Sequence, residues 1–257
     1  MPALEFVAGA AFPRPERTLK EAEMATRVLV VEDEEQTAAL LRDLLRDFGY
    51  EPLLVRSAEA ARSALDAEHP DVILLDLRLP LMSGLDFLQI DRVRESRLPI
   101  VVVSGVATEH EARDCLRRGA LDFVGKPFNV DLLRQILLYA ELQASPPGAD
   151  DARRTADRRR SARALLTLPV RVFEYDGTER QGICVDLSTF GMKLRPFGEV
   201  APGRVVKLYF RPPDGGPGLD LLSILVRRDG SDVYAFRFVN LTQAEFERLR
   251  GVVGESR

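Results

Sequence analysis

Asp76 is the residue whose setting first indicates chemistry. It follows residues 72–75, an unbroken apolar run that is short enough for a strand and carries no polar side chain. That pattern is typical of a parallel strand buried on both faces. Pro80 and Gly84 then end the strand and supply a loop. The spacing therefore places a carboxylate at the carboxyl end of a buried strand, where open α/β sheets bind their ligands.

Other polar side chains follow apolar runs in the same way, namely Glu32, Asp33, Ser104 and Lys126. Because the carboxyl ends of parallel strands meet at one edge of a sheet, we expect these groups to gather around Asp76. Three packed carboxylates repel one another unless a hard cation lies among them, and Mg²⁺ takes oxygen ligands of this kind. A carboxylate can also act as a nucleophile toward phosphorus. Mg²⁺, the Ser104 hydroxyl and the Lys126 ammonium would then neutralise the phosphoryl group on Asp76.

The elements that must position these residues alternate along the chain. The expected strands are 28–31, 51–55, 72–75, 100–103 and 120–124, and the expected helices are 40–48, 57–67, 84–95, 108–118 and 129–143. This alternation predicts a doubly wound five-stranded parallel sheet with right-handed crossovers. Taken singly, Glu32 and Asp33 also fit an acidic helix start, and Lys126 fits a solvated loop. The agreement of several strand ends favours the site.

Composition sets the limits on the class of protein. The chain has 257 residues, a net charge of −4 and 46% hydrophobic residues, which suits two soluble globular domains. The mild acidity gives no argument for nucleic-acid binding, and no apolar run is long enough to cross a bilayer. The two cysteines and two histidines indicate neither a disulfide framework nor a histidine metal site. We therefore expect a cytoplasmic protein with no membrane or DNA partner.

Two segments fit no element. Residues 1–25 contain three prolines and unpatterned charges, so we expect a disordered extension, and translation beginning at Met24 instead of Met1 is a hypothesis that mass spectrometry would test. Residues 144–156 have the Pro- and Gly-rich composition of a linker. They separate a first domain at 26–143 from a second domain at 157–254.

The second domain begins with arginines and continues with strands. Arg158, Arg159 and Arg163 belong to a basic run that fits either a solvated linker or a basic arm for nucleic acid. The expected strands that follow are 170–175, 183–188, 204–210, 219–227 and 233–239. Thr242 and Glu245 form a capping box for a final helix. We expect an antiparallel β-barrel with this helix against it.

Strand 183–188 carries the informative polar residues. Its side chains form two alternating sets, Ile183, Val185 and Leu187 against Cys184, Asp186 and Ser188. This alternation predicts that Asp186 and Ser188 share one face, opposite an apolar core face. Gly191 follows where the backbone can turn sharply or approach a ligand closely. Alone, these residues also fit a surface turn with local capping.

Residues 27–143 resemble the receiver domain of bacterial two-component response regulators. The matching features are Glu32-Asp33, the D-x-x-x-P-x-x-x-G loop from Asp76 to Gly84, Ser104 and Lys126-Pro127. The resemblance implies that Asp76 accepts a phosphoryl group from a histidine kinase. It also implies a Mg²⁺ site made by Glu32, Asp33, Asp76 and the backbone carbonyl of Arg78, with Ser104 and Lys126 on the phosphoryl group.

Three further positions acquire a role from this likeness. Phe123 occupies the switch position, where burial of its ring would report the state, although a core phenylalanine fits as well. Arg78 and Val106 stand where receivers control the access of water to the phosphoryl group. Neither side chain is an acid or an amide, so we predict a phosphorylated form that hydrolyses slowly. Decay within seconds would contradict this prediction.

Residues 157–253 resemble the PilZ domain, a small β-barrel that binds cyclic di-GMP. The two signature motifs are Arg159-x-x-x-Arg163 and Asp186-x-Ser188-x-x-Gly191. The resemblance implies a nucleotide site that comprises Arg158, Arg159, Arg163, Asp186, Ser188 and Gly191. The chemistry agrees, because guanidinium groups pair bidentately with phosphate or guanine. A carboxylate such as that of Asp186 accepts hydrogen bonds from guanine N–H groups.

The sequence therefore predicts a response regulator with two inputs, phosphorylation at Asp76 and cyclic di-GMP, whose combined state is read by another protein. The alternative is an adaptor that is controlled by phosphorylation and binds no nucleotide, which calorimetry would distinguish. A DNA-binding regulator that uses the basic arm is a third reading. Beyond its own phosphoryl transfer and slow dephosphorylation, we expect no enzyme activity. Receivers often pair through their last two helices and strand, so a homodimer is a further expectation.

Overall fold

The computed structural model describes residues 25–105, 108–144, 163–196, 198–200, 205–230 and 232–254. Most of the expected N-terminal extension and all but the first residue of the expected linker lie outside these ranges. The same holds for three of the singled-out residues, Val106, Arg158 and Arg159.

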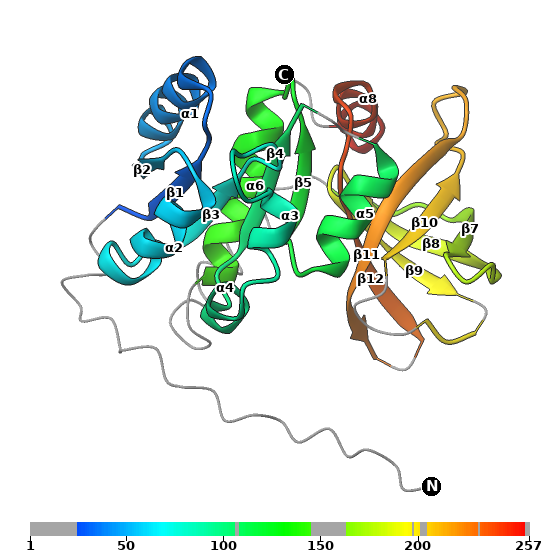
Figure 1. Ribbon diagram of the computed structural model, residues 1–257. Helices are drawn as coiled ribbons and strands as arrows, with labels where there is room; N and C mark the ends of the chain where they lie inside the picture. Colours follow the sequence, from blue (N-terminus) through cyan, green and yellow to red (C-terminus); the bar gives the residue numbers. More distant parts are fainter. Residues whose placement is uncertain are drawn as a thin grey trace, which may run out of the picture.

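The first domain is a parallel five-stranded sheet between two layers of helices (Figure 1). Its strands are β1 (Arg27–Val31), β2 (Glu51–Val55), β3 (Val72–Leu75), β4 (Ile100–Ser104) and β5 (Asp122–Gly125), in the order β2-β1-β3-β4-β5. Its helices are α1 (Glu35–Asp47), α2 (Ala58–Ala67), α3 (Gly84–Phe87), α4 (Asp91–Ser96), α5 (Glu109–Arg117) and α6 (Val130–Ala144). All four residues of β3 are buried, as a strand covered on both faces requires. The predicted doubly wound α/β fold is confirmed.

One expected helix is wrong in its extent. The sequence predicted a continuous helix over 84–95, whereas the structure has α3 and α4 separated by residues 88–90. Ile90 adopts an extended backbone conformation, with ψ of 127°, and so ends the helical path. Asp91 then begins α4, where a carboxylate favours a helix N-terminus.

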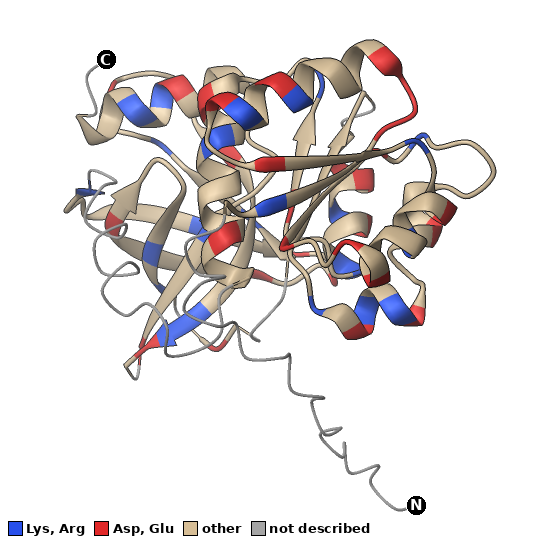
Figure 2. Cartoon of the chain, turned by 90° about the vertical axis from the view of Figure 1, so that its left-hand side faces the viewer, with Lys and Arg blue, Asp and Glu red and all other residues tan. Residues whose placement is uncertain are grey.

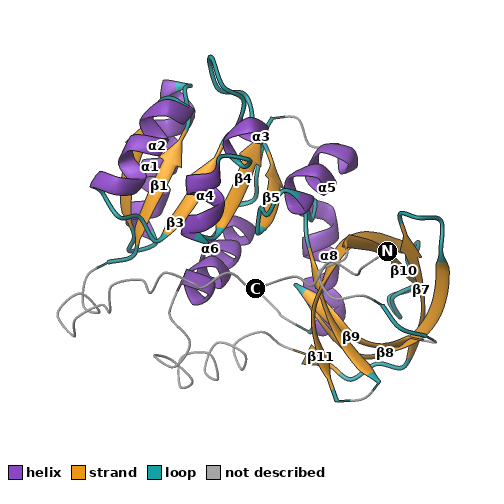
Figure 3. Cartoon of the chain, turned by 60° about the horizontal axis from the view of Figure 1, so that its bottom comes forward, coloured by secondary structure: helices purple, strands orange, loops and turns teal. Residues whose placement is uncertain are grey.

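The second domain is an antiparallel barrel (Figure 3). Its strands are β6 (Arg163–Ala164), β7 (Leu168–Glu174), β8 (Glu179–Ser188), β9 (Gly191–Pro196), β10 (Val205–Phe210), β11 (Leu219–Asp229) and β12 (Val233–Phe238). Six of them follow the order β8-β7-β10-β11-β12-β9 and close through β8–β9 pairing, while β6 adds to β8. The final helix, α8 (Gln243–Val253), has the expected capping box between Thr242 and Glu245. The barrel prediction is confirmed, although β6 and β9 were not among the expected strands.

The strict alternation expected for strand 183–188 is wrong. Cys184 and Leu187 are both fully buried, whereas Ile183 and Val185 are only partly buried. The reason is an irregularity in the pairing of β8 with β9 between Cys184 and Asp186, which inserts an extra residue. Beyond this bulge, Asp186 alternates with the buried Leu187, so its side chain lies off the core face.

The barrel packs against the side of the first domain that is formed by α5, β5 and α6 (Figures 1 and 3). One continuous buried apolar cluster includes Leu133 and Ile136 of α6 as well as Phe238 and Leu241 of the second domain. Acidic and basic residues are interspersed along the outer helices (Figure 2). Among the described residues, no helix has the length and apolar composition that crossing a membrane requires.

Candidate functional site

The predicted acidic residues gather at the carboxyl edge of the parallel sheet. Glu32 follows β1 and Asp76 follows β3, and each side chain is almost completely buried. Carboxylate oxygens of Glu32, Asp33 and Asp76 all lie within 4.8 Å of one another. Lys126, which follows β5, donates hydrogen bonds to Glu32 Oε2 at 2.6 Å and to Asp76 Oδ2 at 2.7 Å. The structure thus brings together four residues from three strand ends.

The loop after β3 holds Asp76 in place. The Arg78 N–H donates to Asp76 Oδ1 at 3.0 Å, and the Gly84 N–H donates to the Leu77 carbonyl at 3.0 Å. A Cβ atom on Gly84 would lie 2.4 Å from the Asp76 carbonyl oxygen. Because that approach is possible only without a side chain, Gly84 lets the loop fold back under the acidic residues. The glycine of the D-x-x-x-P-x-x-x-G motif therefore has a packing cause.

Ser104 ends β4 between the strands that carry Asp76 and Lys126. It is fully buried, and in the described part of the chain its Oγ has no hydrogen-bond partner. The backbone N–H of Lys126 donates to the Ser104 carbonyl at 2.8 Å, which fixes the two residues together. A buried hydroxyl without a partner costs about 1–3 kcal/mol. A functional reason for this cost would be a ligand oxygen atom that accepts a hydrogen bond from the Ser104 hydroxyl.

Burial and pairing set the charges in this crevice. Burial raises the pKa of Glu32 above its ordinary value, although the hydrogen bond and charge of Lys126 act in the opposite direction. Burial alone would lower the pKa of Lys126, but hydrogen bonds to Asp76 and Glu32 outweigh it and raise that pKa. Lys126 therefore stays an ammonium. Asp33 is exposed, which leaves one side of the carboxylate group accessible.

These residues fit a hard divalent cation. Each of the three acids offers an oxygen atom, and Mg²⁺ combines one or two carboxylates with waters and phosphate oxygens. The Lys126 ammonium already compensates part of the negative charge, so the cation would share Asp76 with it.

Two other residues have a predicted role but offer no carboxylate to this group. Phe123 is fully buried in the core of the sheet, and the side chain of Arg78 is exposed.

The second candidate site lies on the barrel where β6, β8 and β9 meet. Arg163 in β6 pairs with Ser188 in the strand register, and its guanidinium donates to Asp186 Oδ2 at 2.9 Å. Ser188 Oγ donates to the Gly191 carbonyl at 3.0 Å. A Cβ atom on Gly191 would lie 2.2 Å from the Phe236 carbonyl oxygen of β12. The structure thus brings together Arg163, Asp186, Ser188 and Gly191.

Comparison with known proteins identifies both domains. Residues 28–138 match the response regulator receiver domain family, and residues 157–255 match the PilZ domain family. The sensory transduction protein RegX3 of Mycobacterium tuberculosis is 34% identical over 172 residues, which cover 67% of this chain and 70% of RegX3. The chain is a response regulator with a PilZ domain.

Other proteins are similar to this response regulator over a shorter part of its length. The nitrogen assimilation regulatory protein NtrX of Azorhizobium caulinodans is 36% identical over 112 residues, which are 43% of this chain. The matched residues are 25% of NtrX, so the chain spans only about a quarter of the length of that protein. The structure of the HemR receiver domain from Leptospira biflexa is also similar, with 26% identity and a TM-score of 0.43, over 47% of this chain and 98% of that domain.

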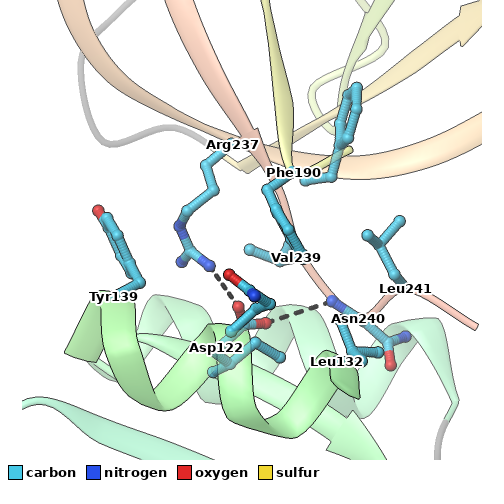
Figure 4. A pocket seen from close by; sticks show the side chains of 11 residues that line it. Asp122, Leu132, Tyr139, Phe190, Arg237, Val239, Asn240 and Leu241 are labelled. Carbon is cyan, nitrogen blue, oxygen red and sulfur yellow. Dashed lines mark hydrogen bonds and ion pairs between the residues drawn. The ribbon is translucent and has the colours of Figure 1, made fainter. Parts of the chain in front are cut away.

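The receiver and the PilZ domain of this response regulator are joined by a buried ion pair that sequence reasoning missed (Figure 4). The guanidinium of Arg237 in β12 donates to Asp122 Oδ2 in β5 and to the Leu121 carbonyl. Asp122 Oδ1 accepts from the Phe123 N–H at 2.8 Å and from the Asn240 N–H at 3.3 Å. The sequence does carry a signal for this pair, because each of the apolar runs 121–124 and 236–239 contains one charged residue, which is rarely buried without a partner.

Each residue of this ion pair is next to a residue for which the sequence predicted a role. Arg237 pairs with the motif glycine Gly191 in the strand register, and Asp122 directly precedes Phe123. The guanidinium also lies over the Tyr139 ring of α6, 4.8 Å from its centroid. A small cavity of about 130 Å³ adjoins the pair (Figure 4). The contact therefore links β12 of the barrel to β5 of the receiver.

A second, more exposed group joins α5 to the barrel. Glu109 accepts from Lys207 Nζ at 2.8 Å and from the Tyr175 hydroxyl at 2.7 Å, and the Arg113 guanidinium lies 4.4 Å from the Tyr175 ring centroid. Burial would raise the pKa of Glu109, but its hydrogen bonds from Lys207 and Tyr175 lower it below the ordinary value. Burial and the Glu109 carboxylate raise the pKa of Tyr175.

Proposed function

We propose that this response regulator accepts a phosphoryl group on Asp76 from a histidine kinase and binds cyclic di-GMP through its PilZ domain. The observation that carries the first part is the convergence of three carboxylates and the Lys126 ammonium at the carboxyl edge of one sheet. The second part is supported by the contact of Arg163 with Asp186, which unites the two motifs.

In the proposed transfer, an Asp76 oxygen attacks phosphorus while the bond from phosphorus to the donor nitrogen breaks. Mg²⁺, held by Glu32, Asp33, Asp76 and the Arg78 carbonyl, would neutralise phosphoryl oxygens when bound. Lys126 exchanges its bond with Asp76 Oδ2 for one with a phosphoryl oxygen, and the Ser104 hydroxyl donates to another. Since the Arg78 side chain positions no water, we expect slow hydrolysis. This self-modification is the whole of the proposed catalysis.

In the proposed nucleotide complex, Arg163 turns from Asp186 toward a phosphate or a guanine edge. Asp186 is then free to accept from guanine N–H groups, and Arg158 and Arg159 would add their charges. Gly191 allows β9 to pass close to β12 beside this site. The ligand must therefore compete with one partly exposed ion pair, whose cost is small.

Calorimetry and phosphoryl labelling of the full chain test the two parts separately. Cyclic di-GMP should release or absorb heat with the wild-type protein and not with Arg163→Ala, while Asp76→Asn leaves this binding intact. A radiolabelled phosphodonor should label the wild-type protein and Arg163→Ala, but not Asp76→Asn. Labelling of Asp76→Asn would refute the assigned acceptor.

A second candidate is a phosphorylation-controlled adaptor that binds no nucleotide. It is favoured by the Arg163–Asp186 ion pair, which satisfies both motif side chains without a ligand. The absence of any cyclic di-GMP binding by protein that is labelled at Asp76 would select it.

Under either candidate, we propose that a further protein reads the signal and that the chain acts in the cytoplasm. The barrel already contacts α5, β5 and α6 of the receiver. A homodimer through that receiver face would therefore have to displace the barrel.

A further inference from the structure

A cleft of about 650 Å³ lies between the receiver and the barrel. Its receiver wall consists of the ends of α4 and α5 and the start of β4, and its barrel wall is part of β11. Tyr139 and Arg237, which join the two domains, also line it. The volume is in the range of binding clefts. Because each domain supplies one wall, this cleft exists only while the domains are docked.

Unpaired positive charge gathers on the receiver wall. Four of the lining residues are the arginines Arg94, Arg97, Arg117 and Arg118. All four are exposed, and their side chains make no hydrogen bond or ion pair with any other described residue. By contrast, exposed Arg92, which is also in α4 but does not line the cleft, is paired with Asp66. Arginines in a last helical turn also stabilise the helix through its dipole, but that role does not require four to line one cleft.

The barrel wall of this arginine cleft is apolar. Ile224 and Val226 of β11 line it, opposite Leu98 of the receiver. The pairing of β11 with β12 is irregular between Leu225 and Arg227, and a bulge of this kind takes the extra residue out of the ladder. Val226 is that residue, and it is 43% exposed. An apolar side chain is thus presented to the cleft, where solvent alone would favour a polar one.

We propose that the arginine cleft binds an acidic segment of a partner protein, in which carboxylates alternate with apolar side chains. Guanidinium groups bind carboxylates in bidentate geometry, so Arg97 and Arg118 supply recognition. The Val226 side chain receives the apolar residues of the segment. This inference identifies the kind of partner that would read the proposed signal, and it depends on domain docking, not on either ligand.

The arginines would attract phosphates as well as carboxylates, but the scarcity of aromatic side chains in the cleft favours a protein segment over nucleic acid. Single-stranded nucleic acid is held by aromatic side chains on which bases stack, and Tyr139 is the one aromatic residue among those that line the cleft. Tyr139 is already covered by the Arg237 guanidinium. Arg237 is already paired with Asp122, so the four arginines of the receiver wall are the donors left for incoming carboxylates.

A display library of random linear peptides, selected on the immobilised full chain, tests this proposal. The enriched peptides should combine Asp or Glu with Leu, Ile or Phe. Binding of a labelled enriched peptide should weaken about tenfold with Arg97→Glu and again with Arg118→Glu, as expected for one charge-assisted contact each. Arg62→Glu on α2 is the matched control, because Arg62 is also exposed but does not line the cleft.

Val226→Ser should weaken the same peptide without altering the fold, since the residue is exposed. Enrichment of peptides without acidic residues would overturn the proposal. Binding by the Arg97→Glu and Arg118→Glu variants that is as tight as wild type would also overturn it. Tighter binding of labelled single-stranded DNA than of any peptide, lost in these variants, would overturn the partner class. Because the selection uses no nucleotide or phosphodonor, a failed cyclic di-GMP titration does not affect its result.

Discussion

The buried ion pair between Arg237 and Asp122 is the contact whose removal should most strongly separate the two domains. Asp122 is 2% exposed, and the side chain of Arg237 is 11% exposed. Arg237→Met keeps the apolar stem and removes the charge. The Asp122 carboxylate then keeps only the backbone donors of Phe123 and Asn240.

Breaking a buried ion pair costs about 3–5 kcal/mol, because the remaining charge is left unpaired in a medium of low polarity. The two remaining backbone donors favour the lower end of that range. A loss of about 3 kcal/mol shifts the docking equilibrium by roughly a hundredfold. Separation of the domains would let water solvate Asp122, so the loss appears as undocking instead of unfolding of either domain.

Hydrogen exchange of the full chain measures this effect. The backbone amides of residues 122–124 and 236–239 should exchange faster in Arg237→Met, while those of β1 and β3 should not change. Lys207→Met is the matched control at the same interface, because its partner Glu109 is 44% exposed and such pairs contribute less than about 1 kcal/mol. Unchanged exchange in Arg237→Met, or an equal effect of Lys207→Met, would refute the reasoning.

Three further predictions concern single positions. Gly84→Ala should destabilise the receiver by about 1–3 kcal/mol in urea unfolding, since its Cβ would meet the Asp76 carbonyl oxygen at 2.4 Å. Gly191→Ala should loosen the β9–β12 pairing and weaken cyclic di-GMP binding in calorimetry, since its Cβ would lie 2.2 Å from the Phe236 carbonyl oxygen. The pKa of Glu109 is lowered from its ordinary value of 4.5. The Glu109 carboxylate therefore stabilises docking at pH values above 4.5, and this stabilisation is lost as the pH falls through the lowered pKa. The distance between fluorescent labels on the two domains should therefore increase in acid, and Glu109→Gln should remove that component of the pH dependence.

Matched controls exist for the glycines. A Cβ atom on Gly105 or on Gly251 would meet nothing within 4 Å, and neither residue has a positive φ. Gly105→Ala and Gly251→Ala should therefore leave the fold and nucleotide binding close to wild type. Destabilisation by these control variants equal to that of Gly84→Ala and Gly191→Ala would contradict the packing argument.

The local pattern of the sequence was sufficient for the fold class and for the acidic crevice. Apolar runs such as 72–75 report burial on both faces, and parallel strands always end at a common edge. For that reason the sequence alone predicts that Glu32, Asp76 and Lys126 lie together. The extent of the helix over 84–95 could not be predicted, because helical spacing continued through Ile90 while its backbone did not.

Tertiary structure alone decided how the two domains communicate. Arg237 and Asp122 lie 115 residues apart in the chain, and no periodic pattern reports which charged side chains meet across an interface. The bulges near Asp186 and Val226 likewise depend on the pairing partner of each strand, so the alternation of side chains could not reveal them. The sequence by itself determined the two folds and their strand-end residues, since these follow from local burial. The ion pair, the bulges and the arginine cleft arise only where separate segments pack together.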